Sequence, residues 1–588
     1  MSEVALEPLI DPFGNGWRAG ASGSQVNSGK SSPASLELDR EIGRTSSISA
    51  KFHQVTPLLM RQLFARPYCS FSSKPHFLVF FALFLCVICL GLTRALTFNE
   101  PLERDQCIYA VAAHEMLAGR PLYSDIWDIK PPAVYLTYAA AEIVAGYGRW
   151  QIYLLGMGAA TATLLAVYSL IHTLSGNRLA ALWTAFFWVL VCSDMGLQAN
   201  QPNTEVFINA FLVSGLALAA RAYRTPNSAR CGAWLLGASC LWAVATFFKQ
   251  VAFLVTLFLA LGAGWQPPRA FAASQSRTRR GFFAVCGLVL PSLILWVAVY
   301  AYFWATGRNA ILHFTLVEYG MVYAREGARV IIAATSFWRR LVPMELFFLW
   351  PLVLLWMMGL RATPAGQSLP RFWGALLLYA LAVQGAVALP GQYLPHYYQL
   401  WLPVVVVGAG LGLSQWHFHA KSIPAQRAVN GSAAAAVALL FATQWPHWNL
   451  PMAEYSRQKY DGNDYFVRLP QTARYLDAQL QPGETFYQMG YDAGLYFDTR
   501  RRPPVGVLSL GSPHLPSLPL WFQRRIIAQL EREKPEMAVV DSAFPATPVT
   551  RYLQKNYVVL PEKVGPEQLI LMARRGGALL RRRASLAR

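Results

Sequence analysis

Four charged side chains that could do chemistry stand close together just after the first long apolar segment of the chain. They are Asp105, Asp125, Asp128 and Lys130, and they fall within 26 residues. Charged groups beside a membrane core are costly and usually mark function. A carboxylate there can activate a nucleophile by accepting its proton, and a lysine can stabilise a departing phosphate. What the chain can do therefore depends on the elements that position these residues.

The composition indicates a protein that crosses a membrane many times. Of the 588 residues, 54% are hydrophobic and 14% are charged, and the mean hydropathy is +0.30. Soluble domains carry about 25% charged residues. We therefore expect a mainly α fold, a polytopic transmembrane helical bundle of about 11 spans, each about 17 to 25 residues long. The apolar runs are 76–94, 151–173, 179–194, 205–222, 232–247, 250–265, 282–305, 343–360, 372–389, 398–414 and 432–447.

The placement of charges predicts the orientation of these spans. With the N-terminus inside, the inner loops carry Lys and Arg but no acid, which is the positive-inside pattern. The twelve Asp and Glu residues between 76 and 450 then all fall outside or at the outer ends of spans, so we expect an acidic working face there. Segment 132–147 is also apolar, but a crossing there would invert every later loop. We expect it to lie along the outer surface. Segment 232–265 fits either one bent helix or two short ones.

Three regions differ in character along the chain. Residues 1–75 are polar and rich in Ser and Gly, which predicts a disordered cytoplasmic tail. No cleavable signal peptide is expected, because the first apolar run starts only near residue 76. Residues 76–450 form the predicted transmembrane domain. In 451–588, helical stretches at 466–480 and 519–533 alternate with short apolar runs, which predicts a small α/β domain outside the membrane.

Charge and cysteine content argue against two other classes of protein. The net charge of +20 is spread over inner loops and both ends of the chain, without the basic stripe and interleaved aromatics of a nucleic-acid groove. We expect no nucleic-acid partner. The eight cysteines show neither a disulfide framework nor zinc spacing. Cys86 and Cys89 form a CxxC pair inside an apolar helix, where packing is the simpler interpretation.

The outer loops bring further candidate residues to the same face. The first loop is expected to form one helix from Asp105 to Gly119 and a second over 132–147. The other four loops contribute polar and charged side chains: Asn203 and Glu205 in the second, Lys249 in the third, Arg339 and Arg340 in the fourth, and His396, Tyr397 and Gln399 in the fifth.

Three motifs in these loops are similar to those of a known family. Together they resemble the C-type membrane glycosyltransferases, and among these the bacterial branch of the protein O-mannosyltransferase and aminoarabinose transferase group. The resemblance covers roughly 76–450, and the tail looks like the extracytoplasmic domains appended in that branch. The motifs are Asp105-xxx-Tyr109-Ala110 with Met116-Leu117-Ala-Gly119, Tyr123 and Asp125-Ile-Trp127-Asp128-x-Lys130-Pro131-Pro132, then Asn203-x-Glu205, and then Gly391 with His396-Tyr397-x-Gln399 and Pro403.

The resemblance implies an enzyme of the cell envelope, in the inner (cytoplasmic) membrane, with its active site on the outer face. It implies that a hexose or pentose passes from a polyprenyl-phosphate donor to a glycan, lipid or protein acceptor, with inversion at C1. The family's catalytic aspartate corresponds to Asp105, as general base, and Lys130 would stabilise the lipid phosphate. The family often has Asp-Glu at this point, whereas Gln106 follows Asp105 here. A single carboxylate is therefore left at this position.

Each candidate also has a structural interpretation. Asp105 could cap its helix or sit in its first turn, and Lys130 could reach up to lipid headgroups. Asp128 could hold Lys130, and Glu205 could cap its helix at the membrane edge. His396 beside a tyrosine is often structural. The candidates for substrate binding are Tyr109, Asp128, Asn203, Glu205, Lys249, His396, Tyr397 and Gln399, and the arginines 339 and 340 are further candidates for the lipid phosphate.

Metal dependence stays open at this level. A hard divalent cation such as Mg²⁺ or Mn²⁺ prefers carboxylate oxygens, and Asp105, Asp128 and Glu205 could supply them if they converge.

Two rival functions make different predictions. A secondary transporter would bury charges at mid-span and show two related halves, whereas these spans are nearly free of charge. A non-catalytic membrane scaffold would not need Asp105. The sequence identifies neither the sugar, the acceptor nor the oligomeric state.

Overall fold

Long apolar helices make up most of the computed structural model, which describes residues 74–265, 276–324, 347–361, 371–508, 510, 518–542 and 546–586. Arg339, Arg340 and residues 1–73 of the predicted tail lie outside the described residues. Seven helical segments in the described part are long and apolar enough to cross a membrane. They are Phe77–Leu96, Arg149–Ser175, Thr204–Arg224, Ser228–Phe248, Thr278–Ala305, Pro395–His419 and Ile423–Trp448.

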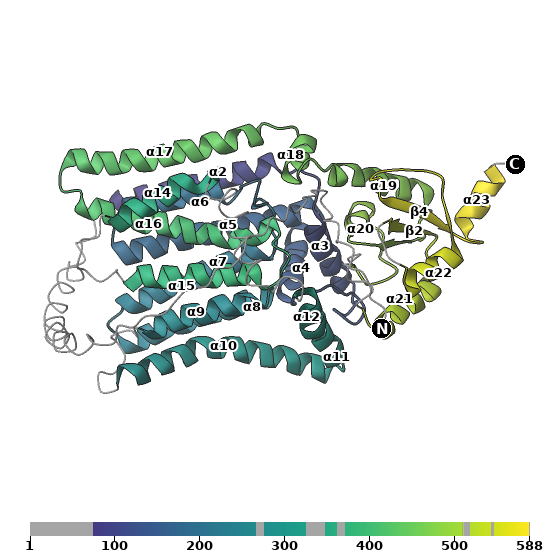
Figure 1. Ribbon diagram of the computed structural model, residues 1–588, viewed down its shortest axis with the longest axis horizontal. Helices are drawn as coiled ribbons and strands as arrows, with labels where there is room; N and C mark the ends of the chain where they lie inside the picture. The colour runs from purple at the N-terminus through teal and green to yellow at the C-terminus, as the bar shows by residue number, and fades with distance from the viewer. Residues whose placement is uncertain are drawn as a thin grey trace, which may run out of the picture. The chain divides into compact units, whose positions relative to one another are not determined.

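The helices of this bundle run alongside one another (Figure 1). The multi-pass helical membrane protein predicted from composition is confirmed. Segment 232–265 forms two helices, separated at Lys249. The bundle consists of α2 (Lys74–Leu96), α5 (Arg149–Ser175), α6 (Arg178–Val191), α7 (Thr204–Arg224), α8 (Ser228–Phe248), α9 (Ala252–Trp265), α10 (Arg277–Ala305), α14 (Phe347–Arg361), α15 (Arg371–Ala388), α16 (Trp401–His419) and α17 (Ile423–Trp448).

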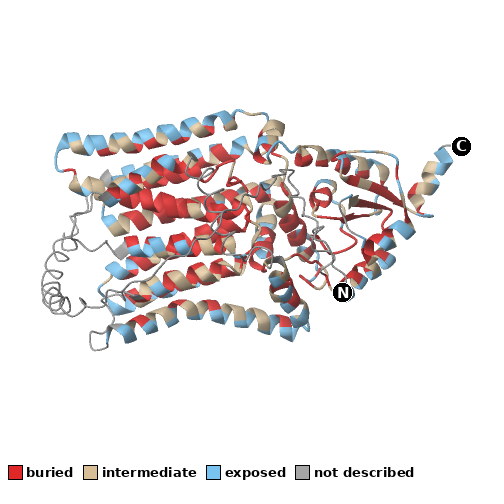
Figure 2. Cartoon of the chain, in the orientation of Figure 1, coloured by how far each residue is buried: buried red, intermediate tan, exposed pale blue. Residues whose placement is uncertain are grey.

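The centre of the bundle is packed through small residues. Helix α16 is buried along nearly its whole length, whereas α17 and α10 expose one side (Figure 2). A Cβ added at Gly359 would lie 2.1 Å from the Cα of Gly412, so α14 and α16 approach backbone to backbone. In a membrane the hydrophobic effect does not drive helices together, because lipid tails are as apolar as the side chains. Helices there associate by close packing at small residues. On α10 the side chains of Leu293 and Val297 are exposed, as a lipid-facing surface requires.

Short helices occupy the end of the bundle that carries the candidate residues. Helices α3 and α4 lie there, and α12 lies near them (Figure 1). These elements are α3 (Arg104–Leu117), α4 (Ala133–Ala145), α11 (Asn309–His313), the π-helix η1 (Phe314–Glu318), α12 (Tyr319–Ala324) and the 3₁₀-helix η3 (Pro395–Leu400). The first outer loop therefore forms two helices, near the bounds expected from its helical spacing.

The C-terminal segment contains a four-stranded mixed sheet in the order β1-β2-β4-β3. Strand β1 pairs parallel to β2, and β4 pairs antiparallel to both β2 and β3. The strands lie at short apolar runs of the tail, at 485–489, 537–540, 557–560 and 569–572 of the sequence. The elements are α18 (Met452–Lys459), α19 (Tyr465–Gln479), β1 (Phe486–Met489), α20 (Gly494–Thr499), α21 (Leu520–Glu533), β2 (Met537–Asp541), α22 (Pro548–Asn556), β3 (Tyr557–Val559), β4 (Leu569–Arg574) and α23 (Ala578–Leu586).

This segment packs on the first outer loop. The backbone N–H of Trp127 donates to the carbonyl of Gly506 at 2.7 Å, and the N–H of Leu508 donates to Trp127 at 3.1 Å. The guanidinium of Arg104 lies 4.9 Å from the ring centroid of Tyr465. The loop that carries the candidate acids is therefore held from both sides, by the bundle and by the C-terminal segment.

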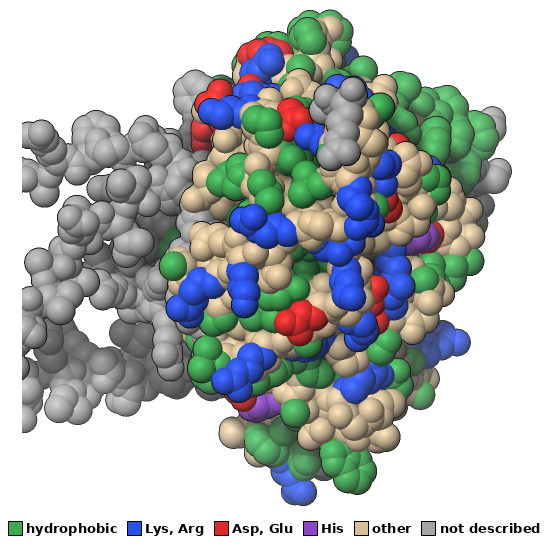
Figure 3. Space-filling model, turned by 90° about the vertical axis from the view of Figure 1, so that its right-hand side faces the viewer, with side chains coloured by type: hydrophobic (Ala, Val, Ile, Leu, Met, Phe, Trp, Pro, Cys, Tyr) green, Lys and Arg blue, Asp and Glu red, His purple; other side chains and the backbone are tan. Residues whose placement is uncertain are grey.

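Among the described residues, the acids expected on the outer side do not form an acidic surface. Six of them are buried: Glu100, Glu103, Glu115, Asp128, Asp194 and Glu205. Figure 3 looks onto the end formed by the C-terminal segment, where Lys and Arg side chains stand out more than acids. The acidic working face expected from the charge pattern is wrong as a surface, because these carboxylates turn inward to partners in the fold.

Candidate active site

Asp105 lies in the first turn of α3, but another residue caps this helix. The side chain of Glu103 accepts the backbone N–H of Asp105 at 3.1 Å, which is the N-cap bond. The carboxylate of Asp105 is thereby left for other contacts. Its Oδ2 accepts the hydroxyl of Tyr109 at 3.2 Å, and its side chain remains 25% exposed. A partly exposed carboxylate with one fixed partner can still accept a proton.

Burial changes the acidity of the cap. Burial, followed by the neighbouring charge of Asp105, raises the pKa of Glu103 to about 8. Glu103 is therefore held mainly in its protonated form near neutral pH. Two adjacent carboxylates disfavour each other's charge, so the position of Asp105 contributes to this raised pKa of Glu103.

A hydroxyl and the backbone hold Asp128 and Lys130 in place. Tyr135 donates its hydroxyl to Asp128 Oδ2 at 2.5 Å and accepts the N–H of Lys130 at 3.2 Å. Tyr123 adopts a φ of 65° and donates to the carbonyl of Lys130 at 2.7 Å. Burial raises the pKa of Asp128, opposed by the charge of Lys130 and the bond from Tyr135. Asp128 is thus enclosed, and its position suits a support for Lys130 better than contact with a substrate.

A buried ion pair joins the second and third outer loops. Lys249 Nζ lies 2.7 Å from Glu205 Oε1, and the two side chains are 8% and 1% exposed. The same ammonium stands 3.3 Å from the ring centroid of Tyr397. Burial lowers the pKa of Lys249 to about 8, while the charge of Glu205 favours the protonated form. The rings of His396 and Tyr397 lie 4.8 Å apart, and those of Tyr109 and Tyr135 lie 6.1 Å apart, which brings this pair to the same end of the bundle as Asp105 and Asp128.

The fifth outer loop reaches Asp105 through a histidine. His396 Nε2 lies 3.9 Å from Asp105 Oδ2, and its Nδ1 is 3.2 Å from Gln198 Oε1. His396 thus bridges the catalytic candidate and the second loop. Gln399 turns away, because its amide donates to the carbonyls of Leu197 and Gln198 at 3.0 Å each. Gln399 therefore links the fifth loop to the second loop.

Most of the residues that the sequence proposed for the site lie close together. Eight of them meet at one end of the bundle: Asp105, Tyr109, Asp128, Lys130, Glu205, Lys249, His396 and Tyr397. Asn203 is fully buried, and neither polar atom of its side chain has a hydrogen-bond partner among the residues that the structure describes. Within the described ranges, no three His, Cys, Asp or Glu side chains are grouped to hold a metal ion. Asp128 and Glu205 are each bonded to a protein group instead.

The sequence did not single out two residues that matter for this geometry. Glu103 lies two positions before Asp105, and its acidic type at a helix start was the available signal. Tyr135 carries the contact to Asp128, but a tyrosine in an apolar helix gave no reason to prefer it over its neighbours.

Comparisons with known proteins identify the fold. No protein-family model matches the chain, and no curated protein matches it. The structure of ArnT from Cupriavidus metallidurans bound to undecaprenyl phosphate is similar with a TM-score of 0.53 and 16% identity, over 85% of this chain and 98% of that one. Its apo form gives 0.54 with the same identity and coverage. The archaeal oligosaccharyltransferase AglB from Archaeoglobus fulgidus, with an inhibitory peptide and a dolichol-phosphate, gives 0.45 and 14% identity, over 83% and 73%.

The chain therefore has an ArnT-like fold, which is the membrane glycosyltransferase fold that the loop motifs predicted.

Proposed function

We propose that this chain, given its ArnT-like fold, transfers a sugar from a polyprenyl-phosphate donor to an acceptor on the outer face of the membrane, with inversion at C1. The observation that carries the proposal is the setting of Asp105. Its carboxylate is fixed by Tyr109, is not used as the helix cap, and lies 3.9 Å from His396 at the bundle end that also carries Lys130. The similar ArnT structure was solved with undecaprenyl phosphate, which supports this class of donor.

The proposed reaction is a single displacement at C1 of the sugar, in which the acceptor oxygen replaces the lipid phosphate. Asp105 accepts the proton of the acceptor hydroxyl as that oxygen attacks C1 of the sugar. The bond between C1 and the phosphate oxygen breaks, and its electron pair stays on the lipid phosphate. The ammonium of Lys130 stabilises this developing charge. Attack from the side opposite the leaving group inverts C1.

The other site residues then position these two. Tyr135, which donates to Asp128, holds the backbone N–H of Lys130, and His396 lies 3.9 Å from the carboxylate of Asp105. The Glu205–Lys249 pair contributes fixed charges beside the phosphate without needing to move.

The proposed topology has the N-terminus inside. The seven long spans together with α6, α9, α14 and α15 make eleven crossings, and α4 stays on the outer surface. The candidate residues and the C-terminal segment then lie outside the inner membrane. We place the boundary between the transmembrane domain and the extracytoplasmic domain near residue 450, after α17.

The test is sugar transfer in membranes from labelled polyprenyl-phosphate donors. Wild type should transfer label, and Lys130→Met should lower kcat by roughly 10²–10³, as loss of one charge-stabilising donor does. Lys130→Arg should recover part of the rate, and Lys421→Met, which alters an exposed lysine between α16 and α17, should behave as wild type. If wild type neither transfers label nor binds any donor, the proposal is wrong.

A further inference from the structure

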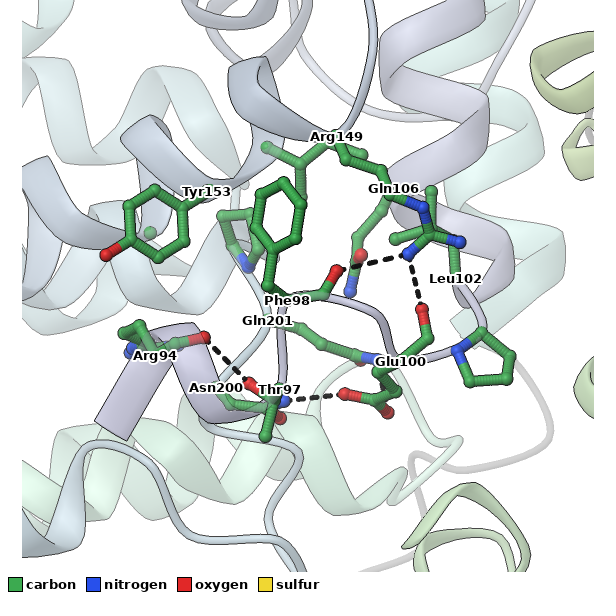
Figure 4. A pocket seen from close by; sticks show the side chains of 14 residues that line it. Arg94, Thr97, Phe98, Glu100, Leu102, Gln106, Arg149, Tyr153, Asn200 and Gln201 are labelled. Carbon is green, nitrogen blue, oxygen red and sulfur yellow. Dashed lines mark hydrogen bonds between the residues drawn. The ribbon is translucent and has the colours of Figure 1, made fainter. Parts of the chain in front are cut away.

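A cavity lies beside α3, and the residues that line it are not used in the proposed transfer. Its volume is about 40 Å³, and its walls come from the ends of α2 and α5, from α3 and from the loop before α7. Arg94 and Arg149 line it from opposite sides (Figure 4). Gln106 also lines it, although its neighbour Asp105 faces the candidate active site.

Arg94 is a buried cation with unused donors. Only 3% of the residue is exposed, and its Nη2 donates to the carbonyl of Cys192 at 2.7 Å. Its Nε and Nη1 are buried and have no protein partner in the described part of the chain. A buried charge is costly unless it is paired and hydrogen-bonded. Arg94 therefore lowers the stability of the free protein. A bound anion that accepted from its two unused donors would offset this cost.

The nearest acid of the cavity wall is already neutralised. Glu100 accepts Lys459 Nζ at 2.7 Å and the amide of Asn200 at 2.7 Å. Arg149 adds a second guanidinium, whose Nη1 donates to the carbonyls of Phe98 and Glu100 (Figure 4). The amide nitrogen of Gln106 is buried and unpartnered. The cavity therefore offers a cationic wall and spare N–H donors.

We propose that this cavity binds a phosphate group, in a site separate from that of the sugar donor. Guanidinium groups suit phosphate because their planar donors match its oxygens. The phosphate would take the free Nε and Nη1 donors of Arg94 and the amide of Gln106, with Arg149 facing it. Its source is either the headgroup of an anionic phospholipid in the outer leaflet or free phosphate, and the two share this chemistry.

Thermal unfolding of the purified full-length protein in detergent tests the site without any sugar transfer. The probes are inorganic phosphate, phosphatidylglycerol and, as a neutral-headgroup comparison, phosphatidylcholine, at constant ionic strength. Wild type should be stabilised, and Arg94→Gln should weaken the apparent affinity at least tenfold. Without a probe, Arg94→Gln should unfold at or above the temperature of wild type, because an unpaired buried charge is gone. Arg308→Gln is the matched control, since Arg308 is bonded to Leu122, Thr306 and Tyr302.

A second variant keeps Arg94 and fills the space. A Cβ at Gly156 would make ordinary contacts, 3.8 Å from Arg94 Nη1 and 3.9 Å from the carbonyl of Asn200. Gly156→Ala should therefore bind as wild type, and Gly156→Leu should lose binding. Stabilisation by phosphatidylglycerol alone assigns a lipid headgroup, and stabilisation by inorganic phosphate assigns the free anion. If neither probe stabilises wild type, or if Arg94→Gln and Gly156→Leu keep its affinity, the site does not exist.

Discussion

Lys249 Nζ and Glu205 Oε1 lie 2.7 Å apart with almost no exposure to solvent, and they join two outer loops at the candidate active site. Such a pair adds little net stability when formed, but losing one partner leaves the other charge buried and alone. The pair is therefore a constraint on how the loops meet.

Removing one member of this pair should be costly. Lys249→Met should lower the free energy of unfolding by about 3–5 kcal/mol, because Glu205 would stay buried and unpaired. The double variant Lys249→Met with Glu205→Gln should recover most of that loss. Unfolding in detergent measures both. A single variant as stable as wild type, or a double variant whose loss is the sum of both single losses, would rule out this coupling.

The cap of α3 should make stability depend on pH. The pKa of Glu103 is raised in the folded chain to about 8, from an ordinary value of 4.5. Between these two pH values the unfolded chain binds fewer protons at this site than the folded chain, so this group's contribution to stability falls as pH rises from about 4.5 to about 8. Below 4.5 that contribution is fully present.

Glu103→Gln isolates this effect, since glutamine keeps an oxygen for the N–H of Asp105 but does not titrate. The variant should show a smaller fall in unfolding temperature between pH 5 and pH 8 than wild type. Glu454→Gln, at an acid of α18, is the control and should keep the slope of wild type. An unchanged slope in Glu103→Gln would mean that Glu103 is ionised throughout that range.

The contact between the first outer loop and the C-terminal segment needs a glycine. A Cβ on Gly506 would lie 1.5 Å from the carbonyl oxygen of Asp125, so Gly506→Ala should separate the two backbones. The amide of Trp127, which donates to Gly506, should then exchange with solvent at least tenfold faster. Gly374→Ala is a matched control, because no atom lies within 4 Å of the added Cβ. Unchanged exchange at Trp127 in Gly506→Ala would contradict this account of the contact.

Much of the fold was predictable because its signals are local. Span length and the alternation of apolar runs in the tail depend on neighbouring residues, and the strands β1 to β4 lie at such runs. The partners of the site were not predictable in this way. The contact of His396 with Asp105 joins the fifth loop to the first, and a single sequence carries no signal for such pairs. The distribution of charges over the loops also predicted on which side of the membrane the acids lie. It could not show that the side chains of Glu100 and Glu205 are buried.

Helix starts illustrate the same limit on a smaller scale. Both Glu103 and Asp105 suit the N-terminus of a helix, and sequence alone could not say which one caps α3. The answer depends on where the chain enters the helix, which is set by the packing of the loop on the bundle and on the C-terminal segment. That choice leaves the carboxylate of Asp105 open to the site.

The most direct test of the account is the rate of sugar transfer by Asp105→Asn, measured beside Asp125→Asn. Both variants neutralise an aspartate of the first outer loop, but Asp125 is bonded to Arg120 instead of facing the site. The account predicts that Asp105→Asn binds donor normally while kcat falls by roughly 10²–10⁴, the usual contribution of a general base, and that Asp125→Asn stays within a few-fold of wild type. Transfer by folded Asp105→Asn at the wild-type rate would contradict the role of Asp105 as the base.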